Sequence, residues 1–558
     1  MRILFLVHAF NSLSQRLYVE LARRGHELSV EFDINDTITI EAITLFRPDL
    51  ILAPFLKRPI PQAVWREHLC WVVHPGPRGD RGPSSLDWAV LEGAHHWGVT
   101  VLQAEQEMDA GPVWASVDCP LRAAAKGSLY RREVSEAAVT AVLEALDNLA
   151  RPGFAPLPLS TRPGHGMLRP AMRHADRALD WDHDDTQTLL RKIRCADGSP
   201  GVRDNWEGRE LYLYDAWPAS GLHGTPGELL ASRDGAICRA SIDGAVWIGR
   251  LRERQGERPG LKLPAVTVLG EAIARLPEAP QGCGYREIHY EEEAEVGYLH
   301  FDFHNGAMGN DQCRRLLAAY KEALARDTRV LVLMGGEEFW SNGLHLHLIE
   351  AAANPADASW DNINAMDDLC RAIILTTDRL VIAALRGNAG AGGVFLALAA
   401  DHVWAAPNVV FNPHYKNMGN LYGSEYWSYL LPRRLGSEGA AVLMQHRLPL
   451  GAAEAKECGL IDGTFGGDRD GFQRELKQRA ITLANAPDHA AQLAAKHTRR
   501  MHDETEKPLD DYRREELERM QLNFYGFDPS YHIARYNFVQ RIPHSRTPLH
   551  LARHRSKR

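Results

Sequence analysis

Short apolar runs alternate with a helical pattern in the first part of the chain. Residues 3–7, 26–32 and 50–53 are apolar runs of the kind that form buried strands, and residues 15–24 have helical spacing. A strand, a helix and a strand at this spacing predict a parallel sheet with crossover helices. In such sheets ligands bind at the carboxyl ends of the strands, so we expect catalytic and binding residues in the loops that follow the strands.

The pattern changes after a loose stretch at residues 151–170, which holds five prolines and predicts a linker. Beyond it, from residue 176 to residue 270, glycine-rich turns separate short apolar runs, at 210–214, 227–231, 236–240 and 245–249. Short strands at this spacing predict a small β-barrel. A second loose stretch, residues 276–284, ends this part.

The remaining chain returns to strands and helices in alternation. Residues 297–301, 329–334 and 379–385 predict strands, and residues 311–326 and 394–400 predict helices. Together the patterns predict an α/β multidomain protein. We expect a domain with a Rossmann-like parallel sheet at residues 1–170, a small β-barrel at 171–278, and a third domain with C-terminal helices at 285–558.

Composition and charge narrow the class of protein. The 558 residues are 45% hydrophobic and 24% charged with a net charge of −8, which is typical of globular proteins and disfavours nucleic-acid binding. The eight cysteines form no C-x-x-C pair, so we expect a reducing compartment and neither a disulfide framework nor a zinc ribbon. Because no long apolar run or secretion signal is present, we expect no membrane span and a cytoplasmic location.

A histidine and an aspartate stand in two loops that follow predicted strands. Residues 73–83 read VHPGPRGDRGP, and residues 107–112 read EMDAGP. His74 and Asp109 can orient a small electrophile between them: the aspartate polarises the histidine or a water, and the histidine stabilises a developing oxyanion. The alternative is that His74 only caps the end of a strand.

These loops resemble those of the hydrolase-like family that uses 10-formyltetrahydrofolate, which includes methionyl-tRNA and glycinamide-ribonucleotide formyltransferases. His74 and Asp109 fall on the family's catalytic histidine and aspartate, whereas Val72 stands where the family has asparagine. The resemblance implies formyl transfer from 10-formyltetrahydrofolate. The missing amide favours a thiol over an amine as the acceptor.

The same resemblance extends to two other segments. The loop of Phe55, Leu56, Lys57 and Arg58 takes the place of the family's pterin-binding loop, which implies that these residues bind the folate. Residues 171–278 resemble the family's C-terminal β-barrel domain.

Two glycine-containing loops follow predicted strands in the third part. Residues 339–345 read FWSNGLH and residues 386–393 read RGNAGAGG, just before a predicted helix. Glycine lets the backbone approach a ligand closely, and a helix N-terminus offers free N–H groups to a negative oxygen. Two such loops facing each other would make an oxyanion hole.

The pair of loops resembles the crotonase (enoyl-CoA hydratase/isomerase) superfamily, which implies a ββα superhelix that binds coenzyme A. By that resemblance the N–H groups of Leu344 and Gly392 hold the thioester oxyanion. The residues implied in CoA binding are Ala307, Met308, Gly343 and Gly393.

Two departures make ordinary hydration of an enoyl-CoA doubtful. Phe395 and Tyr415 stand where hydratases have their glutamates. Residues 412–427 form a polar, aromatic segment that offers Tyr415 and Glu425 as an acid/base pair. The alternative is a loop that is packed by its own aromatic side chains. His345 and His347 can be read as a metal pair or as ordinary packing or surface histidines; no third ligand is evident, and we predict no metal.

The whole chain resembles one family, the HypX (HoxX) hydrogenase maturation factors. The resemblance implies a transferase and lyase that makes carbon monoxide for the Fe(CN)₂CO centre of [NiFe]-hydrogenase. In the implied route, formyl passes from 10-formyltetrahydrofolate to CoA, and the formyl-CoA is decarbonylated.

Two alternatives stay open. One is a formyl-CoA hydrolase or a formyltransferase that acts on a protein or another amine, and the other is a non-catalytic, CoA-binding assembly scaffold. The partners implied are small-molecule substrates and, beyond them, hydrogenase maturation proteins or the hydrogenase large subunit.

Overall fold

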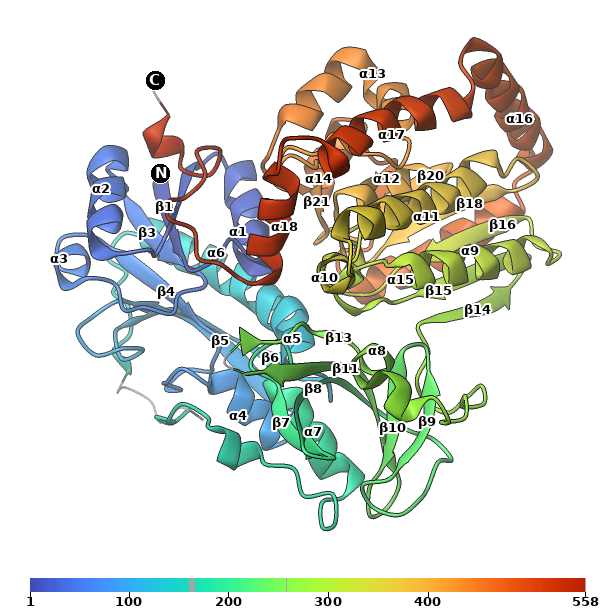
Figure 1. Ribbon diagram of the computed structural model, residues 1–558. Coiled ribbons are helices and arrows are strands. Elements are labelled where there is room, and N and C mark those ends of the chain that lie inside the picture. Colours follow the sequence, from blue (N-terminus) through green and yellow to red (C-terminus); the bar gives the residue numbers. More distant parts are fainter. Residues whose placement is uncertain (160–165, 257, 557–558) are drawn as a thin grey trace. The chain divides into compact units, whose positions relative to one another are not determined.

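The chain folds into two compact units. A computed structural model describes residues 1–159, 166–256 and 258–556 (Figure 1). Residues 1–286 and 544–558 form the first unit, and residues 287–543 form the second. The predicted linker at 151–170 lies in part outside the described residues. The predicted α/β multidomain fold is confirmed.

The first unit begins with a six-stranded sheet of order β2-β1-β3-β4-β5-β6. Its first four strands are parallel, and β5 and β6 are antiparallel to their neighbours. The strands are β1 (Arg2–Val7), β2 (Glu27–Phe32), β3 (Leu50–Ala53), β4 (Cys70–His74), β5 (His96–Gln103) and β6 (Val113–Pro120). The helices are α1 (Ser12–Arg23), α2 (Asp36–Phe46), α3 (Gln62–Trp65), α4 (Ser85–Leu91), α5 (Lys126–Leu129), η1 (Tyr130–Val134) and α6 (Ser135–Ala150).

The second sheet of this unit is antiparallel, with the order β7-β8-β11-β10-β9 and two short strands that pair with β11. Its strands are β7 (Val202–Trp206), β8 (Arg209–Pro218), β9 (Leu229–Arg233), β10 (Ala236–Ala240), β11 (Ala245–Gln255), β12 (Arg258–Pro259) and β13 (Leu263–Pro264). Its helices are η3 (His174–Arg177), α7 (Thr186–Ala196), α8 (Ala265–Leu269) and η4 (Gly270–Ile273). One face of α7 is apolar, and Leu189 and Ile193 on it pack with Leu213 and Ile248 in one core.

The second unit contains a six-stranded sheet of order β14-β15-β16-β18-β20-β23, in which only the β14–β15 pair is antiparallel among the described pairings. The strands are β14 (Ile288–Glu293), β15 (Val296–Phe301), β16 (Val330–Met334), β18 (Leu380–Leu385), β20 (His402–Ala405) and β23 (Gly463–Thr464). A smaller sheet consists of β17 (Phe339–Ser341), β19 (Asn388–Gly390), β21 (Val410–Asn412) and β22 (Leu450–Gly451). Wholly buried β16 and β18 run through the core, as their unbroken apolar sequences predict.

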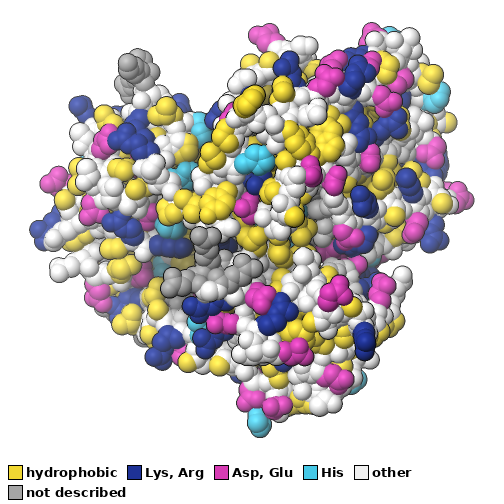
Figure 2. Space-filling model, viewed as in Figure 1, with side chains coloured by type: hydrophobic (Ala, Val, Ile, Leu, Met, Phe, Trp, Pro, Cys, Tyr) yellow, Lys and Arg dark blue, Asp and Glu magenta, His cyan; other side chains and the backbone are white. Residues whose placement is uncertain are grey.

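Helices surround these two sheets (Figure 1). They are η5 (His304–Gly306), α9 (Asn310–Leu324), α10 (Leu346–Ala351), α11 (Pro355–Leu375), α12 (Gly392–Leu398), α13 (Trp427–Gln445), α14 (Ala452–Glu457), α15 (Arg469–Ala484), α16 (His489–Glu506), α17 (Leu509–Tyr525) and α18 (Ser530–Val539). None of the described helices is both long enough and apolar enough to cross a membrane. The face drawn in Figure 2 carries basic and acidic side chains interspersed.

The C-terminal segment differs from the prediction. We expected residues 285–558 to form one domain, but residues 544–558 belong to the first unit. The reason is Glu31 of β2, a buried carboxylate that this segment satisfies: His554 Nε2 lies 2.9 Å from it and Arg555 3.3 Å. The backbone N–H of Phe32 also donates to the Thr547 hydroxyl at 2.8 Å. The other two predicted domain boundaries, between residues 170 and 171 and between residues 278 and 285, remain predictions.

Candidate active sites

His74 is the last residue of β4 and lies between two carboxylates. Its side chain is almost completely buried. Nε2 lies 2.8 Å from Oδ2 of Asp80, and Nδ1 lies 3.7 Å from Oδ1 of Asp109. Asp109 comes from the loop between β5 and β6, where its φ of 56° is a left-handed conformation that is uncommon for a non-glycine residue. The structure therefore brings the predicted pair His74 and Asp109 together.

Asp80 was not singled out from the sequence. It is 1% exposed, and its Oδ1 has no hydrogen-bond partner among the described residues. The loop from β4 folds back tightly, since a β-carbon on Gly76 would overlap both Asp80 Oδ2 and His74 Nε2. An acidic residue six positions after the histidine, in a glycine-rich loop, is the signal that would have found it. A histidine with a carboxylate at each nitrogen has a fixed ring orientation.

A cavity of about 800 Å³ opens beside His74. Its lining includes His74, Asp109 and all four residues predicted to bind folate, Phe55, Leu56, Lys57 and Arg58. Val72 lines it as well, so the sequence position of the missing asparagine does face this cavity. A cavity of this volume has room for a cofactor-sized molecule.

For two polar side chains of the cavity wall, the structure indicates the protonation state or the hydrogen-bond partners. Burial raises the pKa of the Tyr130 hydroxyl to about 12, so it is a neutral donor at physiological pH. The Arg58 guanidinium donates to Oδ1 of Asp36 at 2.9 Å and to the carbonyl of Asp33 at 3.1 Å. These bonds hold the loop of residues 55–58 against the start of α2.

The two glycine loops of the second unit meet, as predicted. An ideal β-carbon on Gly343 would lie 3.4 Å from the nitrogen of Gly392. Gly392 is the first residue of α12, so its N–H is not needed for that helix's own hydrogen bonds. The Gly343 loop is held in place by the N–H of Met308, which donates to the Gly343 carbonyl at 2.9 Å. Leu344 and Gly392 are thus on adjoining backbone segments.

The residues predicted to bind CoA have different exposures. Met308 is completely buried, and Gly343 and Gly393 are buried too, while Ala307 is half-buried. The N–H of Trp340's indole donates to the Gly393 carbonyl at 2.9 Å. Any contact of a ligand with this group would therefore come through Ala307 or through backbone atoms.

Tyr415 and Glu425 form a buried pair beside Gly392. The Tyr415 hydroxyl donates to Oε2 of Glu425 at 2.6 Å. Oε1 of Glu425 packs so closely on Gly392 that a β-carbon there would overlap it. Phe395, at the position of a hydratase glutamate, stacks on the Tyr415 ring with centroids 5.5 Å apart. The structure thus joins the predicted acid/base pair to the predicted oxyanion loop.

The backbone at this pair is in a strained conformation. Glu425 and Tyr426 have φ values of 60° and 58°, in the left-handed region that costs energy for residues with a β-carbon. The N–H of Glu425 donates to Oδ1 of Asp367 at 2.8 Å, and the N–H of Tyr426 donates to Oε2 of Glu516 at 3.0 Å. Two buried carboxylates from α11 and α17 therefore hold the turn that presents Glu425.

The three carboxyl groups are all buried. Burial, with the nearby Asp367 charge, raises the pKa of Glu425 to about 8. Burial also raises the pKa of Glu516 to about 8 and that of Asp367 to about 7, although the Arg513 guanidinium opposes the shift at Asp367. For the Tyr415 hydroxyl, burial raises the pKa well above its ordinary value. A carboxyl group that changes protonation near neutrality is suited to take up and return a proton.

These pKa shifts predict how stability depends on pH. A carboxyl group with a raised pKa in the folded state stabilises that state fully below the unfolded pKa and loses the contribution as pH rises through the folded pKa. We expect the unfolding temperature of the second unit to fall between about pH 5 and pH 8. Calorimetry of the full chain measures this. Glu516→Gln should flatten the slope, and an equal slope in the variant would contradict the assignment.

His345 and His347 lie at the start of α10. His345 precedes α10, and its Nδ1 accepts from the N–H of Leu348 at 3.2 Å. The two imidazole planes are 89° apart with centroids 6.3 Å apart. That these two histidines bind no metal stays a prediction.

Comparisons with known proteins agree with this architecture. The family model for the formyl transferase C-terminal domain matches residues 171–261, and that for enoyl-CoA hydratase/isomerase matches residues 293–523. A hydrogenase maturation factor HoxX from Bradyrhizobium diazoefficiens is 56% identical over 558 residues, 100% of this chain and 98% of that protein. The crystal structure of HypX from Aquifex aeolicus in complex with tetrahydrofolic acid matches with a TM-score of 0.96 and 50% identity, covering 100% of this chain and 99% of that chain. With a formyltransferase-type and an enoyl-CoA hydratase-like part in one chain, this protein belongs to the HypX (HoxX) family of hydrogenase maturation factors.

Proposed function

We propose that this chain makes carbon monoxide for hydrogenase maturation in two steps, with formyl-CoA as the intermediate. The observation that carries the proposal is the contact of Glu425 with Gly392: a buried carboxylate with a pKa of about 8 packs on a glycine of the predicted thioester site. We assign the base to the formyl carbon because Glu425 contacts the glycine whose N–H would polarise the thioester carbonyl. Tetrahydrofolate in a relative's crystal structure supports a folate as the formyl donor.

The first step is formyl transfer near His74. The cavity that His74 and Asp109 line would hold 10-formyltetrahydrofolate, with residues 55–58 against its pterin. The CoA sulfur attacks the formyl carbon, the bond from that carbon to folate nitrogen breaks, and the thiol proton passes to the nitrogen. His74, held between Asp80 and Asp109, stabilises the tetrahedral oxyanion and moves the proton.

The second step is decarbonylation of formyl-CoA in the second unit. The N–H groups of Leu344 and Gly392 polarise the formyl carbonyl. The Glu425 carboxylate takes the formyl proton while the carbon–sulfur bond breaks and its electron pair goes to sulfur. In this proposal Tyr415, which donates a hydrogen bond to Glu425 at 2.6 Å, relays a proton to the thiolate. The products are CO and CoA, and no redox partner is needed. Burial of the pair keeps water away and so disfavours hydrolysis to formate.

The test is to incubate the pure protein with 10-formyltetrahydrofolate and CoA and to trap CO with deoxyhaemoglobin. CO that requires both substrates supports the proposal. Formate or formyl-CoA without CO would overturn the second step and favour a hydrolase or a transferase. Tight CoA binding without any turnover would favour an assembly scaffold.

Gly392→Ala tests the contact that carries the proposal. Because the added β-carbon would overlap Oε1 of Glu425, the carboxylate must move by about an ångström. We expect CO release from supplied formyl-CoA to fall by about 100-fold, the cost of a misplacement of this size. Formyl transfer to CoA is the internal control and should be unchanged. An undiminished rate of CO release would remove Glu425 from its assigned place.

A further inference from the structure

The hairpin that opens the second unit brings two histidines and a glutamate to one face. In the antiparallel pair of β14 and β15, His289 lies opposite His300, and opposite residues share a face. Glu291 is two residues beyond His289, and because side chains alternate along a strand, it shares this face as well. The two proposed steps use none of these residues.

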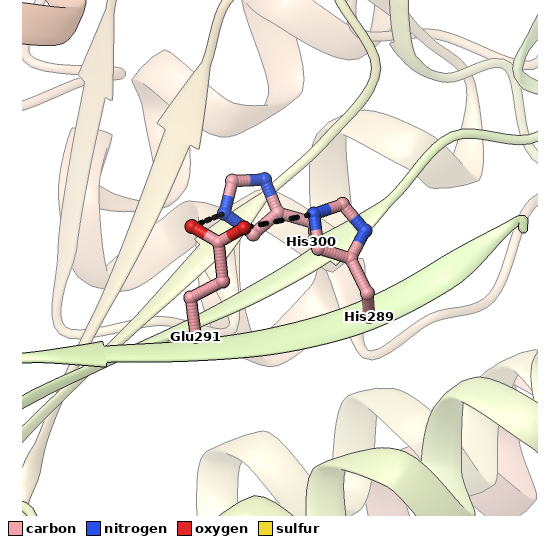
Figure 3. Close-up of side chains that lie close together, drawn as sticks. All are labelled: His289, Glu291 and His300. Atoms are coloured by element: carbon pink, nitrogen blue, oxygen red, sulfur yellow. Dashed lines mark ion pairs between the residues drawn. The ribbon is translucent and has the colours of Figure 1, made fainter. Parts of the chain in front are cut away.

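The three side chains converge (Figure 3). The rings of His289 and His300 are stacked, with centroids 4.3 Å apart and planes 8° apart. Nε2 of His289 lies 3.6 Å from Oε1 of Glu291, and Nε2 of His300 lies 3.9 Å from Oε2. One possible ligand atom from each residue lies within 4.8 Å of those of the other two.

These distances are longer than hydrogen bonds and close to the spacing of ligand atoms around a metal ion. An N–H···O hydrogen bond has its heavy atoms about 2.7–3.2 Å apart, which is shorter than both observed distances. Around a tetrahedral ion with bonds of about 2.0–2.2 Å, two ligand atoms lie about 3.4 Å apart. The distance from His289 Nε2 to Oε1 of Glu291 is about 0.2 Å longer than this spacing. Because an imidazole lone pair lies in the ring plane, the two stacked rings must tilt toward each other for both nitrogens to face one ion.

The strands that hold these three side chains, and the exposure of the side chains to solvent, also suit a binding site. The exposed fractions of the side chains are 15% for His300, 25% for His289 and 56% for Glu291. The imidazoles are thus fixed by two hydrogen-bonded strands, while the carboxylate side stays open to solvent. The nearby ammonium of Lys477 is paired with Glu293 at 2.8 Å, further along the same face, so its charge is compensated.

We propose that His289, His300 and Glu291 bind one divalent first-row transition-metal ion such as Zn²⁺. Two imidazoles and one carboxylate suit Zn²⁺, whereas Mg²⁺ and Ca²⁺ prefer ligand sets made of oxygen. Three protein ligands leave a position for water or for a ligand from solution. Since the ligands come from both strands, the ion also joins β14, at the edge of the sheet, to β15.

A second cluster of similar composition serves as a comparison. His502, Asp503 and Glu506 lie on α16, where the His502 and Glu506 side chains are 68% and 70% exposed. Asp503 is already bound to Arg433 and accepts a hydrogen bond from the Tyr429 hydroxyl at 2.9 Å. One carboxylate of this cluster is therefore engaged, and His502 supplies a matched control for the test.

The test is titration of the tag-free full chain with Zn²⁺ by calorimetry, and with Co²⁺ to read the coordination from its visible absorption. We expect one equivalent of Zn²⁺ with imidazole coordination and no binding of Mg²⁺ at the same concentration. His289→Ala and His300→Ala should each weaken binding by about 100-fold or more, because groups that merely orient a ligand already cost about 10–100-fold. Glu291→Gln should weaken it by about 10-fold or more. His502→Ala should bind like the unmodified chain.

Unchanged Zn²⁺ affinity in both histidine variants, or a loss confined to His502→Ala, would overturn the assignment. Thermal unfolding in the presence of a chelator checks that each variant folds. CO release does not enter the readout, so failure of the proposed function leaves this test unaffected.

Discussion

Glu425→Gln is expected to lower the rate of CO release from supplied formyl-CoA by at least about 100-fold, the lower end of what a general base contributes. Glutamine has the size of glutamate and keeps an oxygen for the Tyr415 hydroxyl, which now lies 2.6 Å from Oε2. It cannot take the formyl proton. The measurement is CO binding to deoxyhaemoglobin under saturating formyl-CoA.

Tyr415→Phe is the matched variant. Phenylalanine keeps the stacking on Phe395 and loses only the hydroxyl, so it separates proton relay from packing. We expect a smaller loss than in Glu425→Gln if the carboxylate is the base. Full activity in Glu425→Gln with a large loss in Tyr415→Phe would reverse the two roles.

The pH dependence of CO release tests the role of Glu425 independently. Because burial raises the pKa of Glu425 to about 8, most of this carboxyl is protonated at lower pH and cannot accept a proton. The rate of CO release should therefore rise with pH, be half-maximal near pH 8 and level off above it. Since the charge of Asp367 also raises the pKa of Glu425, the profile reports the pair of carboxyl groups. A rate that falls over this range would assign the group an acid role.

His74→Ala is expected to lower formyl transfer from 10-formyltetrahydrofolate to CoA by about 100-fold to 10,000-fold. The imidazole is the buried group between Asp80 and Asp109, so its removal leaves both carboxylates without the proton carrier they orient. CO release from supplied formyl-CoA should stay unchanged, because the second step uses residues of the other unit. Formation of formyl-CoA, followed by chromatography, is the measurement.

Asp80→Asn is the companion to this variant. The amide keeps the shape of the side chain at His74 Nε2 but cannot stabilise an imidazolium as a carboxylate does. We expect an intermediate loss of formyl transfer. Loss of CO release from supplied formyl-CoA in His74→Ala or Asp80→Asn would contradict the assignment of the two steps to different units.

The sequence by itself determined the parts of this protein that are local in the chain. The apolar runs of β1, β3, β16 and β18 could be recognised because strands buried on both faces are continuously apolar. His74, Asp109 and the two glycine loops could be found because each lies in a short motif that follows a strand. A backbone that must approach a ligand closely needs glycine at fixed positions, and this leaves a readable pattern.

Only the tertiary structure decided the features that depend on residues far apart in the sequence. Asp367 lies 58 residues before Glu425, yet it holds the strained turn and helps to raise the pKa of Glu425. The C-terminal segment satisfies Glu31, more than 500 residues away. Burial and neighbouring charge set these properties, and both exist only once distant segments have packed together.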